Sequence, residues 1–236
     1  MSSLEIRDLW GGYGDVTVLK GVSLTVQPGQ VVALVGANGV GKSTLLRTIS
    51  GLIRPTRGEI AFLGERIDHA PAHHVVELGF IQVPEGKQLF PQMTVEENLL
   101  VGSTCKRARG DRARSLEEVY SLFPDLTERR RQKAGSMSGG QQQMVAVGRA
   151  LMAKPKLLAM DEPSLGLAPV VVDRLFEVLQ TIHKIGLTLL IIEQNVQQVL
   201  EMADRGYVME NGQIVLTGSG QELLRNEHLQ THYLGV

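Results

Sequence analysis

The sequence contains a single cysteine, Cys105, among its 236 residues. One thiol excludes an internal disulfide and is typical of a protein in a reducing compartment, so the simplest interpretation of Cys105 is a plain thiol near a loop. Aromatic residues make up only 4% of the chain, and the formal net charge is −1. The sequence therefore offers neither a base-stacking surface nor a basic field, and we expect no nucleic-acid partner.

Long apolar runs are also missing. No segment approaches the roughly 20 apolar residues that a membrane-spanning helix needs, and the N-terminal stretch "MSSLEIRDLW" lacks the apolar core of a signal peptide. Hydrophobic residues are 43% and charged residues 21% of the chain, as in ordinary soluble globular proteins. The length suits one large α/β domain, or a core domain with a smaller lobe.

Short, nearly continuous apolar runs alternate with helical stretches along the chain. The runs cover residues 31–36, 79–84, 157–161 and 187–193, and the helical stretches cover residues 42–53, 141–153, 170–185 and 196–203. Apolar runs of this kind are typical of strands that are buried on both faces of a parallel sheet. Strands that alternate with helices predict an α/β fold.

Other segments break this alternation. Residues 4–30 alternate between apolar and polar side chains, which predicts antiparallel strands. Residues 95–150 contain no convincing strand, so we expect a helical lobe inserted into the sheet domain. Near the C-terminus, Asn211 and Gly212 separate two strand-like runs, a pattern that predicts a two-residue hairpin turn.

The segment "VGANGVGKST" follows the first buried run, opens a helix and fits the spacing G-x-x-x-x-G-K-[ST]. Its glycines let backbone N–H groups point at phosphates, and the helix N-terminus favours negative charge. Lys42 is expected to neutralise the β- and γ-phosphates, and Ser43 to hold Mg²⁺ through its hydroxyl. We predict that ATP is contacted here by Gly36, Asn38, Gly39, Gly41, Lys42, Ser43 and Thr44.

A second polar group follows the apolar run "LLAMD". Asp161 ends this run and is expected to hold Mg²⁺, while Glu162 would lie beside the γ-phosphate and orient or deprotonate the attacking water. An acidic pair after a strand often marks only a solvated strand end. Together with the phosphate loop, the catalytic interpretation is favoured, because hydrolysis then needs only positioning and charge neutralisation.

The segment "GSMSGGQQQMVAVGRALMAKPKLLAMDEP" contains the most specific pattern. Ser138 and Gln141 have the spacing of a capping box, which locally indicates no more than a capped helix. This segment lies after the phosphate loop and includes the Asp161 strand, however, and in that order Ser138-Gly139-Gly140-Gln141 resembles the signature of the ABC transporter ATPase family. The resemblance extends over the whole chain.

The resemblance implies a P-loop NTPase fold of the RecA type, with an N-terminal antiparallel β subdomain and an inserted α-helical subdomain. The core would span residues 1–92 and 154–236, and the helical subdomain, which carries the signature, residues 93–153. In the family, two ATPs are bound between two chains. The resemblance therefore implies that Ser138, Gly139, Gly140 and Gln141 contact the nucleotide of an opposite chain, since an exposed helix N-terminus supplies suitable donors.

Further positions match family features or depart from them. Tyr13 matches the aromatic residue that stacks on adenine, although it also fits an ordinary tyrosine at a strand edge. The segment Val83–Pro91 matches the loop that links core and lobe and responds to membrane subunits. That loop usually carries a glutamine where this chain has Glu85, which we expect to contact the nucleotide and its metal. The loop after Glu162 ends in Ala168 rather than in aspartate.

The position after the last parallel strand is usually a histidine that senses the γ-phosphate, and here it is Gln194. An amide can donate a hydrogen bond to phosphate, but it cannot carry the charge of a histidinium or titrate near neutral pH. We predict that Gln194 takes part in catalysis without contributing a pH step. Glu193 and Asn195 are interpreted as supporting or surface groups.

The stretches "VPEGKQLFPQMTVEENL", "DEPSLGLAP" and "IEQN" together are similar to the ATPase subunits of high-affinity branched-chain amino-acid importers. Relatives that import urea or short amides share much of this pattern. The resemblance implies integral membrane permease subunits and, indirectly, a periplasmic or surface solute-binding protein. It also implies a second ABC ATPase subunit, usually a different related chain although a homodimer fits too, and a cytoplasmic location on the inner face of the membrane.

Other functions fit the sequence less well. Soluble ABC proteins that act on DNA or ribosomes generally carry long coiled-coil insertions or two ATPase halves, and this chain has neither. A regulatory module without hydrolysis is disfavoured by Glu162, the residue best suited to activate water. His69, His73 and His74 lack an acidic or thiol partner at ligand spacing, and residues 64–71 are expected to form a surface loop.

Overall fold

A six-stranded sheet in the order β10-β9-β3-β8-β7-β6 forms the centre of the computed structural model, which describes residues 2–231. Its parallel strands are β3 (Val31–Val35), β6 (Phe80–Val83), β7 (Leu157–Asp161), β8 (Thr188–Glu193) and β9 (Arg205–Glu210). β3, β7 and β8 are buried along their whole length, which explains the continuous apolar runs. β10 (Gln213–Gly218) pairs antiparallel with β9 through the predicted turn, where Asn211 and Gly212 both have positive φ.

The N-terminal segment and residues 57–66 form a second, antiparallel sheet in the order β2-β1-β4-β5. Its strands are β1 (Leu4–Tyr13), β2 (Val16–Val26), β4 (Arg57–Phe62) and β5 (Glu65–Arg66). The expectation of a surface loop over residues 64–71 was wrong in part, because β5 lies there and is followed by the buried Ile67 and Asp68. A strand of this length is too short to produce a pattern of its own in the sequence.

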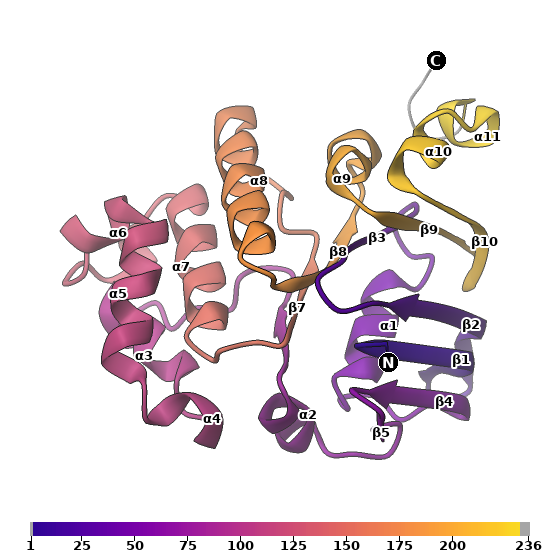
Figure 1. Ribbon diagram of the computed structural model, residues 1–236, viewed down its shortest axis with the longest axis horizontal. Coiled ribbons are helices and arrows are strands. Elements are labelled where there is room, and N and C mark those ends of the chain that lie inside the picture. The colour runs from indigo at the N-terminus through magenta and orange to yellow at the C-terminus, as the bar shows by residue number, and fades with distance from the viewer. Residues whose placement is uncertain (1, 232–236) are drawn as a thin grey trace.

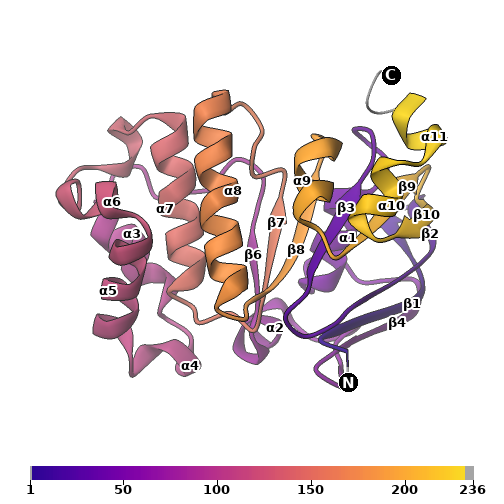
Figure 2. The same cartoon turned by 45° about the horizontal axis from the view of Figure 1, so that its top comes forward.

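Several helices cover one face of the six-stranded sheet, and a further helix and the antiparallel sheet lie on the other side (Figure 2). Val31, Ala33 and Val35 belong to a core shared with α7 (Gly139–Leu151), α8 (Pro169–Lys184) and α9 (Val196–Met202). The alternate residues Val32 and Leu34 belong to a core shared with α1 (Lys42–Ile49) and strands β1, β2 and β4. Successive side chains of a strand point to opposite faces, so the sheet separates two hydrophobic cores.

The chain between β6 and β7 is helical and lies at one side of the molecule (Figure 1). It forms α3 (Val95–Gly102), α4 (Lys106–Arg109), α5 (Arg112–Leu122), α6 (Pro124–Glu128), a 3₁₀ turn (Ala134–Ser136) and α7. Its only β pairing among the described residues is an isolated bridge between Thr94 and Lys133. The subdomain boundaries given above stay a prediction. The remaining helices are α2 (Ala72–Leu78), α10 (Gly220–Leu224) and α11 (Glu227–Leu229).

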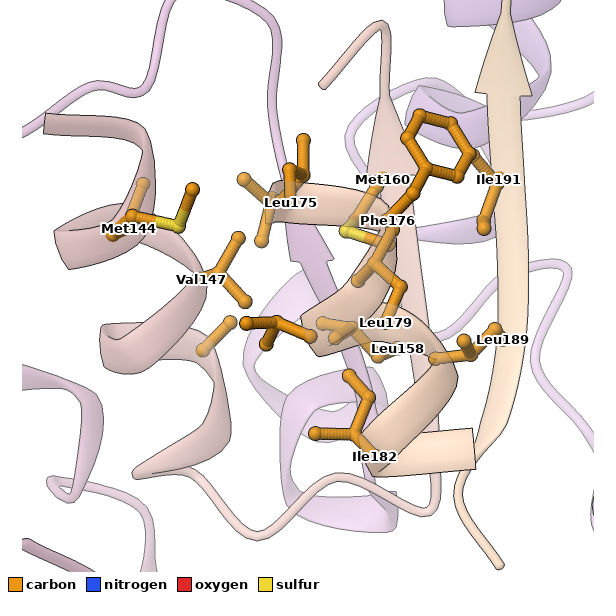
Figure 3. Close-up of a cluster of buried hydrophobic side chains, with 14 of the residues drawn as sticks. Met144, Val147, Leu158, Met160, Leu175, Phe176, Leu179, Ile182, Leu189 and Ile191 are labelled. Atoms are coloured by element: carbon orange, nitrogen blue, oxygen red, sulfur yellow. The ribbon is translucent and has the colours of Figure 1, made fainter. Parts of the chain in front are cut away.

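Helix α8 is held against the sheet by apolar side chains (Figure 3). Leu175, Leu179 and Ile182 recur at helical spacing and are fully buried beside Leu158 of β7 and Leu189 of β8. Each such leucine contributes about 1.5–3 kcal/mol through removal of its side chain from water. This packing fixes the strand ends that carry the polar residues of the site. Among residues 2–231, no helix combines the length and apolar character that a bilayer crossing requires.

Candidate nucleotide-binding and hydrolysis site

The predicted phosphate loop connects β3 to α1, and two of its glycines are required by geometry. Gly41 has a φ of 113°, a conformation that other residues rarely adopt. A Cβ atom at Gly36 would lie 2.3 Å from the carbonyl oxygen of Met209, so any larger residue would push β9 away from the loop. The backbone can fold this tightly because both positions lack a side chain.

Lys42 is the first residue of α1, and its side chain is only 4% exposed. Its ammonium donates hydrogen bonds to the carbonyl oxygens of Gly36 at 2.8 Å and Ala37 at 3.0 Å. The same nitrogen lies 3.2 Å from Oε1 of Glu162. These contacts place a buried positive charge inside the curve of the loop, where phosphate oxygens are predicted to bind.

Ser43 and Asp161 meet although they lie far apart in the sequence. The hydroxyl of Ser43 donates to Oδ1 of Asp161 at 3.0 Å, because β7 ends close to the start of α1 at the carboxyl edge of the sheet. Burial raises the pKa of Asp161, as do the nearby carboxylates of Glu162 and Glu85, while Ser43 and Arg47 act in the opposite direction.

The chemistry of these groups fits Mg²⁺ better than a softer metal. Ser43 and Asp161 provide a hydroxyl and a carboxylate oxygen, and Mg²⁺ prefers oxygen ligands. Within residues 2–231, no group of three or more His, Cys, Asp or Glu residues is arranged to hold a metal ion. A metal here therefore needs further oxygens, which the phosphates of a nucleotide supply.

Glu162 follows β7 in a backbone conformation that is unusual for its residue type. Its φ is +47°, and such a conformation costs about 1–3 kcal/mol and is found preferentially at functional sites. The backbone N–H of Glu162 donates to the carbonyl oxygen of Ile192 in β8 at 2.9 Å. This bond holds the backbone of Glu162 against β8, and the carboxylate pairs with Lys42.

A cavity of about 310 Å³ lies at this edge of the sheet. Residues predicted from the sequence make up most of its lining, which consists of Asn38, Gly39, Gly41, Lys42, Ser43, Thr44, Glu85, Glu162 and Leu165. Leu165 is the residue that sequence reasoning missed. No local pattern singles it out, because its loop also contains Leu167, Ala168 and two prolines, and the structure leaves Leu165 50% exposed.

Tyr13 lies at the end of β1 and is 46% exposed. Its hydroxyl accepts a hydrogen bond from Nη1 of Arg47 in α1 at 2.8 Å. Desolvation raises the pKa of Tyr13, but hydrogen bonds with Thr44 and Arg47 outweigh it and leave that pKa below its usual value. The hydroxyl is therefore anchored to α1 while the residue stays partly exposed, and the contact of Tyr13 with adenine stays a prediction.

The structure does not bring the signature residues into this cavity. Ser138, Gly139, Gly140 and Gln141 lie at the N-terminus of α7, and none of them is among the residues that line the cavity. The predicted capping box is formed: the Ser138 hydroxyl accepts from the Gln141 N–H at 3.3 Å, and Oε1 of Gln141 accepts from the Ser138 N–H at 3.1 Å. Ser138 and Gly139 are exposed, as a contact with another chain would require.

Gln194 directly follows β8 at the same edge of the sheet, and it is exposed. It is not among the residues that line the cavity, so its predicted contact with the γ-phosphate stays a prediction. Asn195 is exposed as well, whereas the Glu193 side chain is buried. Ala168, at the position where the family usually has an aspartate, is the N-cap residue of α8 and forms no side-chain hydrogen bond to the helix.

Comparison with known proteins agrees with this geometry. The family profile described as ABC transporter matches residues 19–165. The chain is 46% identical to the high-affinity branched-chain amino acid transport ATP-binding protein BraG of Pseudomonas aeruginosa, over 94% of this chain and 95% of that one. It is 34% identical to the probable branched-chain amino acid transport ATP-binding protein LivF of Archaeoglobus fulgidus, over 99% of both chains.

Solved structures support the same conclusion. The crystal structure of the ADP conformation of MJ1267, an ATP-binding cassette of an ABC transporter, is 31% identical and superposes with a TM-score of 0.88 over 100% of both chains. The resemblance inferred from the signature is thereby confirmed, as is the α/β P-loop fold with an antiparallel β part. The chain belongs to the ABC transporter family and is one of its nucleotide-binding ATPases.

Proposed function

We propose that this chain is the ATP-hydrolysing subunit of an importer for branched-chain amino acids. The supporting observation is its 46% identity to BraG over 94% of this chain and 95% of that one. The similarity extends over almost the whole of both chains, so it includes residues outside the nucleotide site as well as the site itself. The protein itself would not touch the amino acid, which membrane subunits and a separate binding protein would handle.

In this proposal, residues 36–44 bind the phosphates of ATP and Tyr13 stacks on the adenine. Lys42 exchanges its contacts with the loop carbonyls for phosphate oxygens. Mg²⁺, held by Ser43 and Asp161 with Glu85 nearby, supplies charge neutralisation at the β- and γ-phosphates when it is bound.

Glu162 is the residue proposed to activate the attacking water. Its carboxylate lies at the cavity beside the Lys42 ammonium, and its backbone is held by the bond to Ile192, so it can orient a water molecule and accept its proton. Gln194 is proposed to donate an amide N–H to the γ-phosphate. Glu162→Gln keeps the size of the side chain and removes the base.

The exposed N-terminus of α7 is proposed to contact the ATP of a second ABC subunit. Such a contact favours the closed pair only when nucleotide is present, because bridging phosphates bind the closed state better than the open one. The solution size of Glu162→Gln with and without Mg-ATP tests this step. A shift to a dimer means that the chain closes on itself, whereas bound nucleotide without a shift indicates a different partner chain.

Coupling to the membrane is proposed to use a groove of about 580 Å³ between the core and the helical segment. Glu85, Phe90 and Arg149 are among its lining residues. Arg149 of α7 donates to the carbonyl oxygens of Lys87 at 2.9 Å and Gln88 at 2.8 Å, which ties the linking loop to the signature helix. Closure of the dimer would therefore move this loop, and permease subunits docked in the groove would follow.

Uptake of labelled leucine, isoleucine and valine in cells that lack the gene tests the proposed substrate. The parent chain should restore uptake and Glu162→Gln should not, with urea and acetamide uptake measured in parallel. Restoration of urea or amide uptake instead would assign the chain to that type of importer. Unchanged uptake of every one of these solutes would contradict an import role for them.

A further inference from the structure

Glu193, interpreted from the sequence only as a supporting or surface group, is a buried carboxylate to which the proposed mechanism gives no task. It ends β8 with 1% exposure, and no Lys, Arg or His among the described residues forms an ion pair with it. Burial of a carboxylate is unfavourable unless hydrogen bonds compensate for lost water. The donors that compensate it therefore indicate what the residue does.

Those donors come from two different loops. Oε1 of Glu193 accepts from the backbone N–H of Ser164 at 2.9 Å, and Oε2 accepts from the backbone N–H of Gln194 at 3.2 Å. Burial raises the pKa of Glu193, while the Ser164 hydroxyl and the backbone of Ser164, Asn195 and Gln194 lower it through hydrogen bonds. A single side chain thus joins the turn after β8 to the loop after β7.

Both loops lead to residues of the proposed site. The loop after β7 continues from Glu162 to Leu165, which lines the nucleotide cavity. The other backbone N–H donors within it stay local, since Leu165 donates to Glu162 and Leu167 donates to Ser164. In the described part of the chain, Glu193 is thus the only group outside this loop that accepts a backbone N–H from residues 163–168.

We propose that Glu193 is a positioning residue that joins the loop after Glu162 to Gln194, so that both move as one unit when the nucleotide site closes. The proposal rests on the site residues assigned under the proposed function. Glu193 does not touch the reacting atoms in this account. It acts by holding the backbone of its two neighbours, and its effect should appear in turnover rather than in nucleotide binding.

A glutamate side chain suits this task better than a glutamine side chain does. An ionised carboxylate has two oxygens that only accept hydrogen bonds, whereas a glutamine side chain has one accepting oxygen and one donating nitrogen. In Glu193→Gln, one of the two backbone N–H groups would face another donor. The variant therefore breaks one half of the connection while it keeps the size of the side chain.

Thr188 provides a matched control at the opposite end of the same strand. It is buried with 3% exposure, and its hydroxyl accepts a hydrogen bond from the backbone N–H of Gly29 at 2.9 Å. Both Thr188→Val and Glu193→Gln remove from β8 a buried side-chain acceptor that is bonded to a backbone N–H. In Thr188→Val this change lies far from the nucleotide cavity. A loss of turnover that came only from a broken buried hydrogen bond in β8 should therefore appear in Thr188→Val as well.

The experiment measures kcat and KM for Mg-ATP and the melting temperature of the full chain with each substitution. We expect Glu193→Gln to lower kcat about tenfold or more with KM changed less than about threefold, because small misplacements of catalytic groups reduce turnover strongly. Thr188→Val should keep kcat within about twofold of the parent even though it leaves a buried backbone N–H without its acceptor. Glu193→Asp, which keeps two acceptors on a shorter side chain, should fall between them.

Equal kcat losses in Glu193→Gln and Thr188→Val, or a rise in KM with unchanged kcat, would overturn the positioning role. If Glu193→Gln does not fold, Glu193→Asp replaces it in the test. A turnover equal to that of the parent in Glu193→Asp would then overturn the positioning role. Glu162→Gln, measured alongside, distinguishes a failure of the positioning role of Glu193 from a failure of the proposed site assignment. Loss of activity there with full activity in Glu193→Gln contradicts this inference alone, whereas full activity in both contradicts the assignment of the site.

Discussion

The ion pair between Lys42 and Glu162 predicts a measurable coupling in stability. Their side chains are 4% and 10% exposed and 3.2 Å apart, so water compensates little when one partner is removed. Lys42→Met should lower the free energy of unfolding by about 2 kcal/mol, because it leaves a nearly buried carboxylate without its charged partner. Glu162→Gln should lower it less, since Lys42 keeps its two carbonyl acceptors.

The double variant should be more stable than the sum of the single effects predicts. Removal of both charges leaves no unpaired ion, so the coupling energy should be about 1–2 kcal/mol. Urea unfolding of the nucleotide-free chain and its variants measures this. As a control, the pair Arg114 and Glu118, with exposures of 78% and 54%, should show no measurable coupling. Additivity within about 0.5 kcal/mol for Lys42 and Glu162 would refute the reasoning.

Two further predictions concern stability. The pKa of Asp161 is raised in the folded chain, so the folded chain binds the proton of this carboxyl more tightly than the unfolded chain does. The stability due to this group is therefore present at low pH and is lost as pH rises through the folded pKa. Asp161→Asn should therefore unfold at a higher urea concentration than the parent at pH 7, while losing Mg²⁺-dependent hydrolysis; an unchanged or lower midpoint would contradict this. Leu179→Ala, in the core under α8, should lower the free energy of unfolding by about 2–5 kcal/mol, whereas Val170→Ala on the same helix, at a position that is 74% exposed, should not change it measurably by the same assay.

The parallel strands and the phosphate loop were predictable because local sequence determines them. β3, β7 and β8 are buried on both faces, which forces continuous apolar runs. Gly41 has a backbone conformation that favours glycine, so the loop carries its own signal. Ser43 and Asp161 could be paired in advance because parallel strands end at one edge of the sheet, where such sites form.

Other features depend on contacts between distant segments and carry little local signal. The proposed task of Glu193 depends on the N–H of Ser164, 29 positions away, and no pattern in residues 189–195, "LLIIEQN", reveals that contact. Leu165 lines the cavity only because of the path that its loop takes after Glu162. The short strand β5 exists because β4 is available to pair with it, and pairing with a neighbour outweighs the intrinsic preference of so short a segment.

The most direct test of the central claim is the rate of Mg-ATP hydrolysis by Glu162→Gln compared with the parent, with nucleotide binding measured on both. We expect a rate at least about 10²-fold lower with binding retained, because the substitution leaves the proposed phosphate and metal ligands Lys42, Ser43 and Asp161 in place. Hydrolysis at the parental rate would contradict the assignment of Glu162 as the residue that activates water.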